Sequence, residues 1–344
     1  MRVVDLRSDT ITKPTPEMRR AMADAEVGDD VFGEDPTVNR LQEMAAELLA
    51  KEAALFVSSG TMGNLVSLLT QCGRGDEVIL GDQSHIFFYE QGGLSALGGI
   101  HPRTVPNQSD GTMHPHEIES AIRSDNVHFP RSRLIALENT HNRCNGNPLN
   151  LAYLQTIKNL ANQHELKIHI DGARIFHAAT ALDTPVRELV SMADSVTFCL
   201  SKGLSAPVGS VVCGSKDFVA EARRTRKVLG GGMRQAGILA AAGIVALQCM
   251  IDRLADDHLN ARKLAEGLAS FKDLAVDLEL VRTNIVFFQI ARNDLTPTEL
   301  AERLKAEGVL LLPTGPRQLR AVTHFYVAPD DIDYALKAFS KILS

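Results

Sequence analysis

Apolar runs and helical patterns alternate along most of the chain. Seven short apolar runs predict buried strands, at residues 53–57, 77–80, 103–105, 133–137, 166–170, 195–200 and 209–213. Between these runs the spacing of apolar residues predicts helices, among them 61–71, 151–164 and 186–192. Strands that alternate with helices form parallel βαβ units. The pattern therefore predicts an α/β fold with a mostly parallel, doubly wound sheet that is covered on both faces.

The two ends of the chain differ from this alternating part. Residues 1–40 are polar and rich in turn signals, which predicts an arm with one short helix at 17–25. After residue 248 the pattern predicts a charged helix at 251–271, apolar segments at 281–290 and 321–327, and helices at 298–307 and 332–343. We therefore expect an arm plus a large domain at 1–248 and a small α+β domain at 249–344.

Composition narrows the class of protein. The 344 residues are 44% hydrophobic and 23% charged, which is typical of a soluble globular protein, and the net charge of −6 favours neither nucleic acid nor an anionic membrane as partner. The apolar stretch 236–251 is too short for a membrane span and predicts a buried helix. The start lacks the apolar core of a signal peptide, and five scattered cysteines indicate reduced thiols. We expect a cytoplasmic protein.

An acid and an amine follow two of the predicted strands. Asp171 ends the run 166–170 and Lys202 follows the run 195–200. Either charge alone is usually a solvated loop residue. In α/β sheets, however, ligands bind beyond the carboxyl ends of the strands, where both residues fall. Our hypothesis is that Lys202 carries pyridoxal phosphate as a Schiff base and that Asp171 keeps the cofactor's ring nitrogen protonated.

Other candidates fall at the same predicted edge. The turn Ser59, Gly60, Thr61 and Met62 joins a strand to a helix, and it suits either a phosphate or a plain helix start capped by Ser59. His85 follows the second strand, where an imidazole can stack on a flat cofactor or simply be exposed.

A basic run at 223–227 is typical of a solvated helix face. It leads through three glycines to Arg234, a candidate phosphate ligand.

A metal site is a weaker alternative. His114 and His116 form one pair of possible ligands, and His169 and Asp171 form another. Neither pair has a third ligand at short spacing. We therefore expect no catalytic metal and no zinc site.

Six motifs together resemble the low-specificity L-threonine aldolases, which are fold-type-I pyridoxal-phosphate enzymes. The motifs cover nearly the whole chain in the family's order: DLRSDT at 5–10, VGDDVFG at 27–33, ENTHN at 138–142, DGAR at 171–174, LSKG at 200–203 and GGGMRQ at 230–235. The resemblance implies the cofactor pyridoxal phosphate, an amino-acid substrate and a tetramer of paired subunits that share active sites.

The resemblance also implies residue roles. Lys202 matches the Schiff-base lysine, Asp171 the partner of the pyridine nitrogen, and Arg174 the arginine near the phenolic oxygen. Gly60, Thr61 and Met62 match the turn that binds the cofactor phosphate, and His85 matches the imidazole stacked on the ring. Arg234 matches an arginine that contacts the phosphate from a neighbouring subunit. Ser8, Arg174 and Arg320 match the groups that hold the substrate carboxylate. His128 matches a histidine that reaches toward the substrate hydroxyl. Phe32 stands where the family commonly has tyrosine, and the stretch Arg143-Cys144-Asn145 after Asn142 is also unlike the family pattern.

The activity implied is the cleavage of L-threonine or L-allo-threonine to glycine and an aldehyde. His85, His128, a water between them and the cofactor phosphate are all compatible with the role of base. Two alternatives remain: another pyridoxal-phosphate lyase, such as a β-eliminating lyase, and a non-catalytic protein that binds the cofactor.

Overall fold

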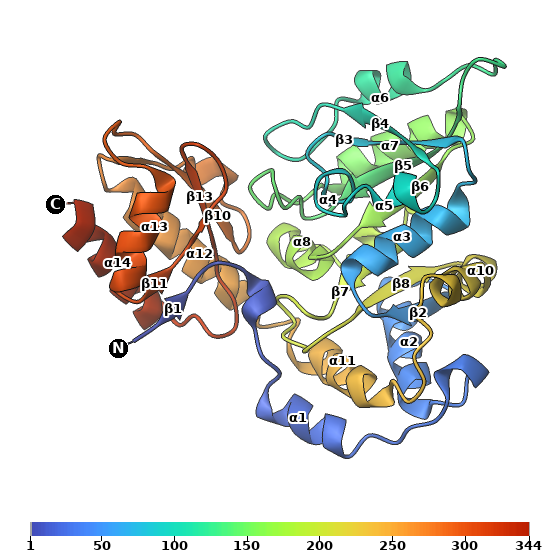
Figure 1. Cartoon of the computed structure of the whole chain (residues 1–344), viewed down its shortest axis with the longest axis horizontal. Helices are drawn as coiled ribbons and strands as arrows, with labels where there is room; N and C mark the ends of the chain where they lie inside the picture. Colours follow the sequence, from blue (N-terminus) through green and yellow to red (C-terminus); the bar gives the residue numbers. More distant parts are fainter. Residues whose placement is uncertain (1, 344) are drawn as a thin grey trace.

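The computed structural model describes residues 2–343 and shows two domains side by side (Figure 1). The large domain contains a seven-stranded sheet in the order β2-β8-β7-β6-β5-β3-β4. Only β8 runs antiparallel to its neighbours, so the mostly parallel sheet is confirmed. Its strands are β2 (Ala53–Val57), β3 (Asp76–Gly81), β4 (His101–Val105), β5 (Arg131–Glu138), β6 (Lys167–Asp171), β7 (Ser195–Cys199) and β8 (Ser210–Gly214).

Helices cover both faces of this sheet. On β3, Ile79 faces the largest apolar cluster, whereas Val78 and Leu80 face a second cluster on the opposite side. Alternate strand residues point to opposite faces, so each strand is buried twice and its apolar run is continuous. The helices of this part are α1 (Pro16–Ala23), α2 (Pro36–Leu49), α3 (Gly60–Gln71), α4 (His85–Phe88), α5 (Gly93–Ala96), α6 (Pro115–Ala121), α7 (Leu151–Gln163), α8 (Ile175–Leu182), α9 (Val186–Leu189), α10 (Lys216–Val228) and α11 (Gly237–Cys249).

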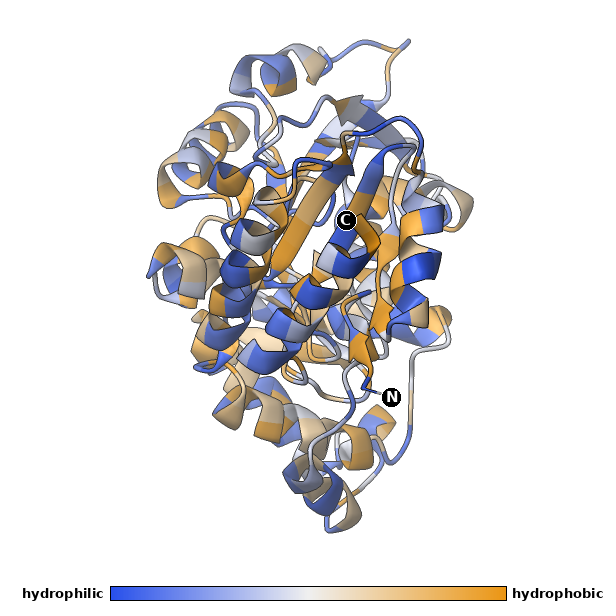
Figure 2. Cartoon of the chain, turned by 90° about the vertical axis from the view of Figure 1, so that its left-hand side faces the viewer, coloured by the Kyte–Doolittle hydropathy of each residue, from blue (hydrophilic) through white to orange (hydrophobic). Residues whose placement is uncertain are grey.

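The small domain is an antiparallel sheet packed against three helices. Its sheet has the order β12-β13-β10-β9. The strands are β9 (Leu274–Ala275), β10 (Ile285–Ile290), β11 (Val309–Leu310), β12 (Leu312–Pro313) and β13 (Gln318–Val322), and the helices are α12 (Leu254–Ala269), α13 (Pro297–Ala306) and α14 (Pro329–Leu343). Figure 2 shows hydrophilic residues on the outward faces of the helices and hydrophobic residues on the strands behind them. This amphipathic pattern explains why the sequence predicted the helices.

The N-terminal arm packs on the small domain. Strand β1 (Val4–Asp5) pairs in parallel with β11, and Val4 and Leu6 are buried in the apolar cluster of the C-terminal residues. The arm therefore crosses from the small domain to the large one and brings residues 7–12 to the space between them. The division at residues 248 and 249 stays a prediction, and the structure has α11 ending at Cys249 and α12 beginning at Leu254.

The apolar segment 236–251 forms the buried helix α11, as predicted. Within residues 2–343 no single helix has the length and apolarity to cross a membrane, although the bent pair α11 and α12 passes that test by length and composition.

Candidate active site

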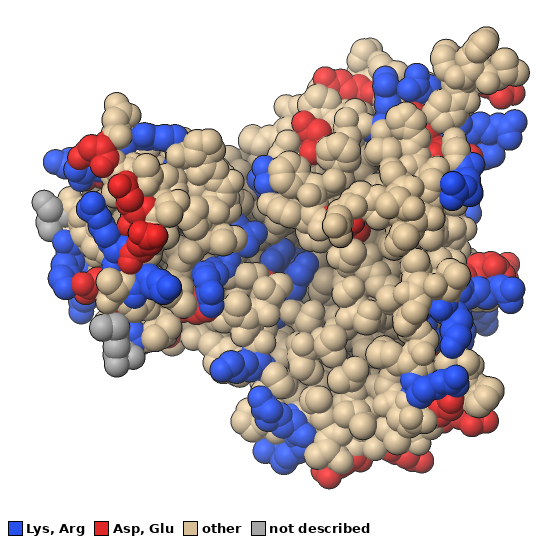
Figure 3. All heavy atoms as spheres, in the orientation of Figure 1, with Lys and Arg blue, Asp and Glu red and all other residues tan. Residues whose placement is uncertain are grey.

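A cavity of about 270 Å³ lies where the large domain faces the small one. Figure 3 shows Lys and Arg atoms inside the hollow between the two domains. The lining residues come from the arm, from the carboxyl ends of the parallel strands and from the small domain: Ser8, Thr10, His85, Tyr89, Asn142, Arg174, Lys202, Leu312, Thr314 and Arg320. The structure thus brings together five of the residues that the sequence analysis singled out, which are His85, Arg174, Lys202, Ser8 and Arg320.

Asp171 is an ionised carboxylate in the floor of this site. It is 3% exposed, and its oxygens accept hydrogen bonds from Asn64 Nδ2 at 2.8 Å and from the Ala173 amide at 3.0 Å. Burial acts to raise its pKa, but the charges of His85 and Lys202 outweigh that effect and hold the pKa below its usual value. A fixed, buried negative charge suits a group that must stay protonated, such as a pyridine nitrogen.

Asn64 connects Asp171 to a second carboxylate. Its Nδ2 also donates to Glu90 Oε1 at 2.8 Å, and the same oxygen lies 2.8 Å from His85 Nδ1. Burial raises the pKa of Glu90. Burial acts to lower the pKa of His85, but the hydrogen bond to Glu90 and the charge of Asp171 raise it overall. Glu90 therefore orients the imidazole, and Nε2 is the ring nitrogen without a partner among residues 2–343.

His169 completes this network as a neutral imidazole. It is fully buried, and burial lowers its pKa to about 4. Its Nδ1 lies 2.8 Å from Ser195 Oγ and its Nε2 lies 3.1 Å from Asn64 Oδ1. Because an amide oxygen only accepts, Nε2 carries the proton and donates it to Asn64. The ring thereby orients Asn64, so both nitrogens of His169 are already used and neither is free for a metal.

Within residues 2–343, the side chains that could together hold a metal ion are not the two pairs that the sequence suggested. Ligand atoms of His85, Glu90 and Asp171 lie within 4.8 Å of one another. Asn64 and His85 already donate to these carboxylates, which makes the group a hydrogen-bonded network. His114 and His116 are exposed at the start of α6 and do not line the cavity.

The turn before α3 has the features of an anion site. Ser59 Oγ caps the helix by accepting the Met62 amide at 3.1 Å, while the amides of Gly60 and Thr61 have no acceptor within the helix. A Cβ on Gly60 would lie 2.9 Å from Cys199 Sγ, so a larger residue there would displace the buried Cys199 side chain. Helix and cap together can hold a phosphate.

Arg174 is held by a residue that the prediction did not assign. Its Nε and Nη2 donate to the two oxygens of Asp9, both at 2.7 Å, and both side chains are buried. Burial acts to raise the pKa of Asp9, but the charge and hydrogen bonds of Arg174 lower it. Nη1 of Arg174 and the second hydrogen of Nη2 remain for other contacts, and Nη1 lies 3.4 Å from Asn142 Oδ1. The predicted carboxylate contact of Arg174 is thus limited to its two terminal nitrogens.

Arg320 has only neutral partners. Its Nη1 donates to Asn142 Oδ1 at 2.9 Å and its Nη2 to the Arg7 carbonyl at 3.2 Å, while its buried Nε has no partner among the described residues. Ser8 Oγ accepts from Thr10 Oγ1 at 2.8 Å, which leaves the Ser8 hydroxyl hydrogen available. A guanidinium without a carboxylate, beside a free hydroxyl, is suited to bind the carboxylate of a ligand.

Three predicted site residues do not reach this cavity. His128 is exposed in the turn before β5, at the end of the strand opposite to the cavity. Phe32 is 74% exposed. Arg234 is half-exposed and donates to Asp29 Oδ2 at 2.9 Å. Within one chain, therefore, none of the three contacts the site.

The basic run at 223–227 is not one solvated face, so that prediction is wrong. Arg226 is 2% exposed, and it donates to Asp30 Oδ2 at 2.6 Å and to the Phe56 carbonyl at 2.7 Å. Helical spacing turns this residue inward while Arg224 and Lys227 stay exposed.

Comparisons with known proteins agree with this geometry. A family model described as β-eliminating lyase matches residues 5–292. The chain is 53% identical to the probable low-specificity L-threonine aldolase 2 of Arabidopsis thaliana, over 99% of this chain and 98% of that protein. It is 44% identical to the low specificity L-threonine aldolase of Escherichia coli K12, over 96% of each. The solved threonine aldolase of Leishmania major superposes with a TM-score of 0.85 at 21% identity, over 99% of each chain.

The family model and the relatives first define a lyase, and the fold is that of the type-I pyridoxal-phosphate enzymes. More narrowly, the chain belongs to the low-specificity L-threonine aldolase family.

Proposed function

We propose that the protein binds pyridoxal phosphate at Lys202 and cleaves threonine and related β-hydroxy-α-amino acids to glycine and an aldehyde. The observation that carries this proposal is the convergence of Lys202, the ionised Asp171 and the oriented His85 on one side of the sheet. The names of the relatives support the reaction. The buried Asp171 and the helix start at Gly60 fit the two ends of the cofactor, its ring nitrogen and its phosphate.

Each part of the site has a separate task in this reaction. Pyridoxal phosphate, when bound, provides a sink for the electrons of the breaking Cα–Cβ bond. Asp171 holds a proton on the ring nitrogen, because its own pKa is depressed. Arg320 and the Ser8 hydroxyl would bind the substrate carboxylate and so select which bond at Cα is broken. His85 lines the same cavity as Lys202, and its Nε2 is free to take or relay the proton of the β-hydroxyl.

The experiment that tests this proposal replaces the lysine. Lys202→Ala should abolish glycine release from L-threonine and the visible absorbance of the cofactor bound to the enzyme. Lys216→Ala, at the exposed start of α10, is the matched control and should retain both. Turnover by Lys202→Ala at a rate near that of the control would sink the assignment.

A β-eliminating lyase is the second candidate, because the matching family model carries that description. The two reactions differ in products. Incubation with L-threonine and L-serine should release glycine if the protein is an aldolase and ammonia if it is a β-eliminase. Ammonia as the main product would mean that the protein is a β-eliminating lyase and that the same residues serve that reaction.

We further propose a cytoplasmic tetramer whose subunits share active sites. Support comes from the exposure of Phe32 and Arg234, and from a basic surface hollow of about 610 Å³ near Arg223 and Lys227. Light scattering should give four times the chain mass of 37.4 kDa. Mixing inactive Lys202→Ala with inactive Arg234→Gln should restore part of the activity, since hybrids would contain intact shared sites. A monomeric mass would contradict this proposal.

A further inference from the structure

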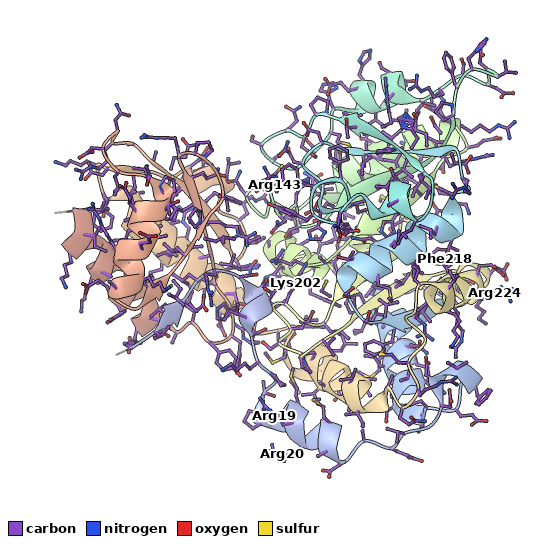
Figure 4. All side chains as sticks on the ribbon, viewed as in Figure 1. Arg19, Arg20, Arg143, Lys202, Phe218 and Arg224 are labelled. Atoms are coloured by element: carbon purple, nitrogen blue, oxygen red, sulfur yellow. The ribbon has the colours of Figure 1, made fainter. Side chains whose placement is uncertain are left out.

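Arg143 is a fixed cation at the entrance to the candidate site. Its Nε donates to Gln83 Oε1 at 2.9 Å, its Nη1 donates to Tyr89 Oη at 2.8 Å, and its guanidinium lies 3.9 Å from the ring centre of Phe88. Its Nη2 has no hydrogen-bond partner among residues 2–343. Figure 4 places Arg143 and Lys202 along the side of the large domain that faces the small one.

The cavity that Arg143 lines adjoins the cavity of the candidate site. Arg143 lines a small cavity together with Phe287 and Gln318. That cavity shares four lining residues with the larger one: Tyr89, Asn142, Thr314 and Arg320. A substituent that extends from a ligand held at Arg320 can therefore reach the side where Arg143 lies. The Tyr89 oxygen accepts a hydrogen bond from Arg143, which leaves the Tyr89 hydroxyl free to donate to such a substituent.

The charges around these two cavities are unbalanced. Asp9 neutralises Arg174. Arg320 and Arg143 have only neutral partners, and neither cavity is lined by Asp or Glu among the described residues. The α-carboxylate of an amino-acid substrate would account for Arg320. Lys202 would be taken up by the cofactor in the proposed function. Arg143, which is half-buried, is then left without an anion, and a guanidinium forms strong charge-assisted hydrogen bonds with a carboxylate.

We propose that Arg143 recognises substrates whose β-carbon carries a second carboxylate, that is, 3-hydroxyaspartates. The inference rests on the proposed aldolase function. The Cα–Cβ bond breaks, the β-hydroxyl loses its proton to a base and becomes the carbonyl of glyoxylate, and Cα gains a proton to give glycine. The reaction needs no oxidant or reductant. Threonine carries a methyl group at this place and has nothing to pair with Arg143.

The test compares the catalytic efficiencies for two substrates. Glycine release from L-threonine and from each 3-hydroxyaspartate diastereomer is measured for the cofactor-loaded wild type, R143Q and R143K. The ratio of kcat/KM for hydroxyaspartate to kcat/KM for threonine should fall about 30-fold in R143Q, mainly through KM, because a charged hydrogen bond is lost. The ratio for R143K should lie between those of the wild type and R143Q, since lysine keeps the charge but loses the planar guanidinium. R187Q, at an exposed site on α9, should leave the ratio unchanged.

Salt dependence provides a second readout that needs no variant. Raising the ionic strength should increase the wild-type KM for hydroxyaspartate more than that for threonine, because screening weakens the extra ion pair. The proposal is overturned if the wild type cleaves threonine but not hydroxyaspartate, or if the ratio is the same in R143Q and the wild type. Failure to cleave threonine would instead refute the proposed function.

Discussion

The floor and the mouth of the site are built in opposite ways. The floor consists of Asp171, Asn64, Glu90, His85 and His169, and its carboxylate oxygens and amide hydrogens are matched to one another. In the mouth, Arg320 and Arg143 contact only neutral groups.

The difference shows which contacts each region leaves for its ligands. A buried network whose polar groups pair with one another, apart from His85 Nε2, is rigid and holds its charges in fixed positions. Such a network suits a cofactor that stays bound through every turnover. Guanidinium groups without carboxylates are instead incomplete until an anion arrives, which suits substrates that come and go. We therefore expect changes in the floor to affect all substrates alike, and changes in the mouth to discriminate among them.

Asp171→Asn should give the largest effect after loss of the lysine. An amide cannot hold the extra proton on the ring nitrogen, so kcat should fall by about a thousandfold, or about 4 kcal/mol of transition-state stabilisation. The fall should be the same for threonine and for hydroxyaspartate, and some cofactor should still bind. The measurement is kcat for both substrates together with the absorbance of the bound cofactor.

If kcat of Asp171→Asn fell by different factors for threonine and for hydroxyaspartate, the floor would also discriminate between substrates, contrary to our expectation. Asp29→Asn is the matched control, because Asp29 accepts from Arg234 outside the cavity of its own chain. If sites are shared between subunits, the control should change cofactor affinity slightly and leave the substrate ratio intact. A near-normal rate in Asp171→Asn would mean that the ring nitrogen needs no carboxylate.

The fold could be predicted because the large domain's strands are buried on both faces. Their continuous apolar runs, as at residues 166–170, are distinct from the helical spacing around them. The arm was harder to place. Residues 4–6 carry too short an apolar signal to reveal that they pair with residues 309–310, which lie about 300 positions further along the chain. Long-range pairing of two-residue strands leaves almost no local pattern.

The charged residues of the site were predictable in part. Asp171 ends β6 and Lys202 lies three residues after the end of β7, so their position follows from the topology. Asp9, Asn64, Glu90 and Asn142 were missed as partners, although Asp9 and Asn142 lie inside motifs that the sequence analysis singled out and Glu90 lies five residues after His85. Their roles depend on which side chains meet across the chain, and one sequence does not contain that information. Arg226 shows the same limit, since its buried partner Asp30 is about 200 positions away.

Glu90→Gln should give a smaller effect than Asp171→Asn. Glutamine can still accept from Asn64 and His85, so the geometry of the floor should persist. The carboxylate charge that raises the pKa of His85 is removed, however, and that pKa should fall. If neutral His85 is needed as base, the acidic limb of the kcat/KM profile should move to lower pH, and the rate at neutral pH should drop about tenfold because the base is weaker.

The pH profile is what separates this role from simple packing. Glu302→Gln, at an exposed position on α13, is the control and should keep the wild-type profile. Glu90→Asp, which restores a carboxylate on a shorter side chain, should recover the position of the acidic limb in part. The tenfold loss and the shift should be equal for threonine and hydroxyaspartate, since His85 serves the bond cleavage common to both. A loss of activity with an unmoved acidic limb would mean that Glu90 supports the floor without setting the basicity of His85.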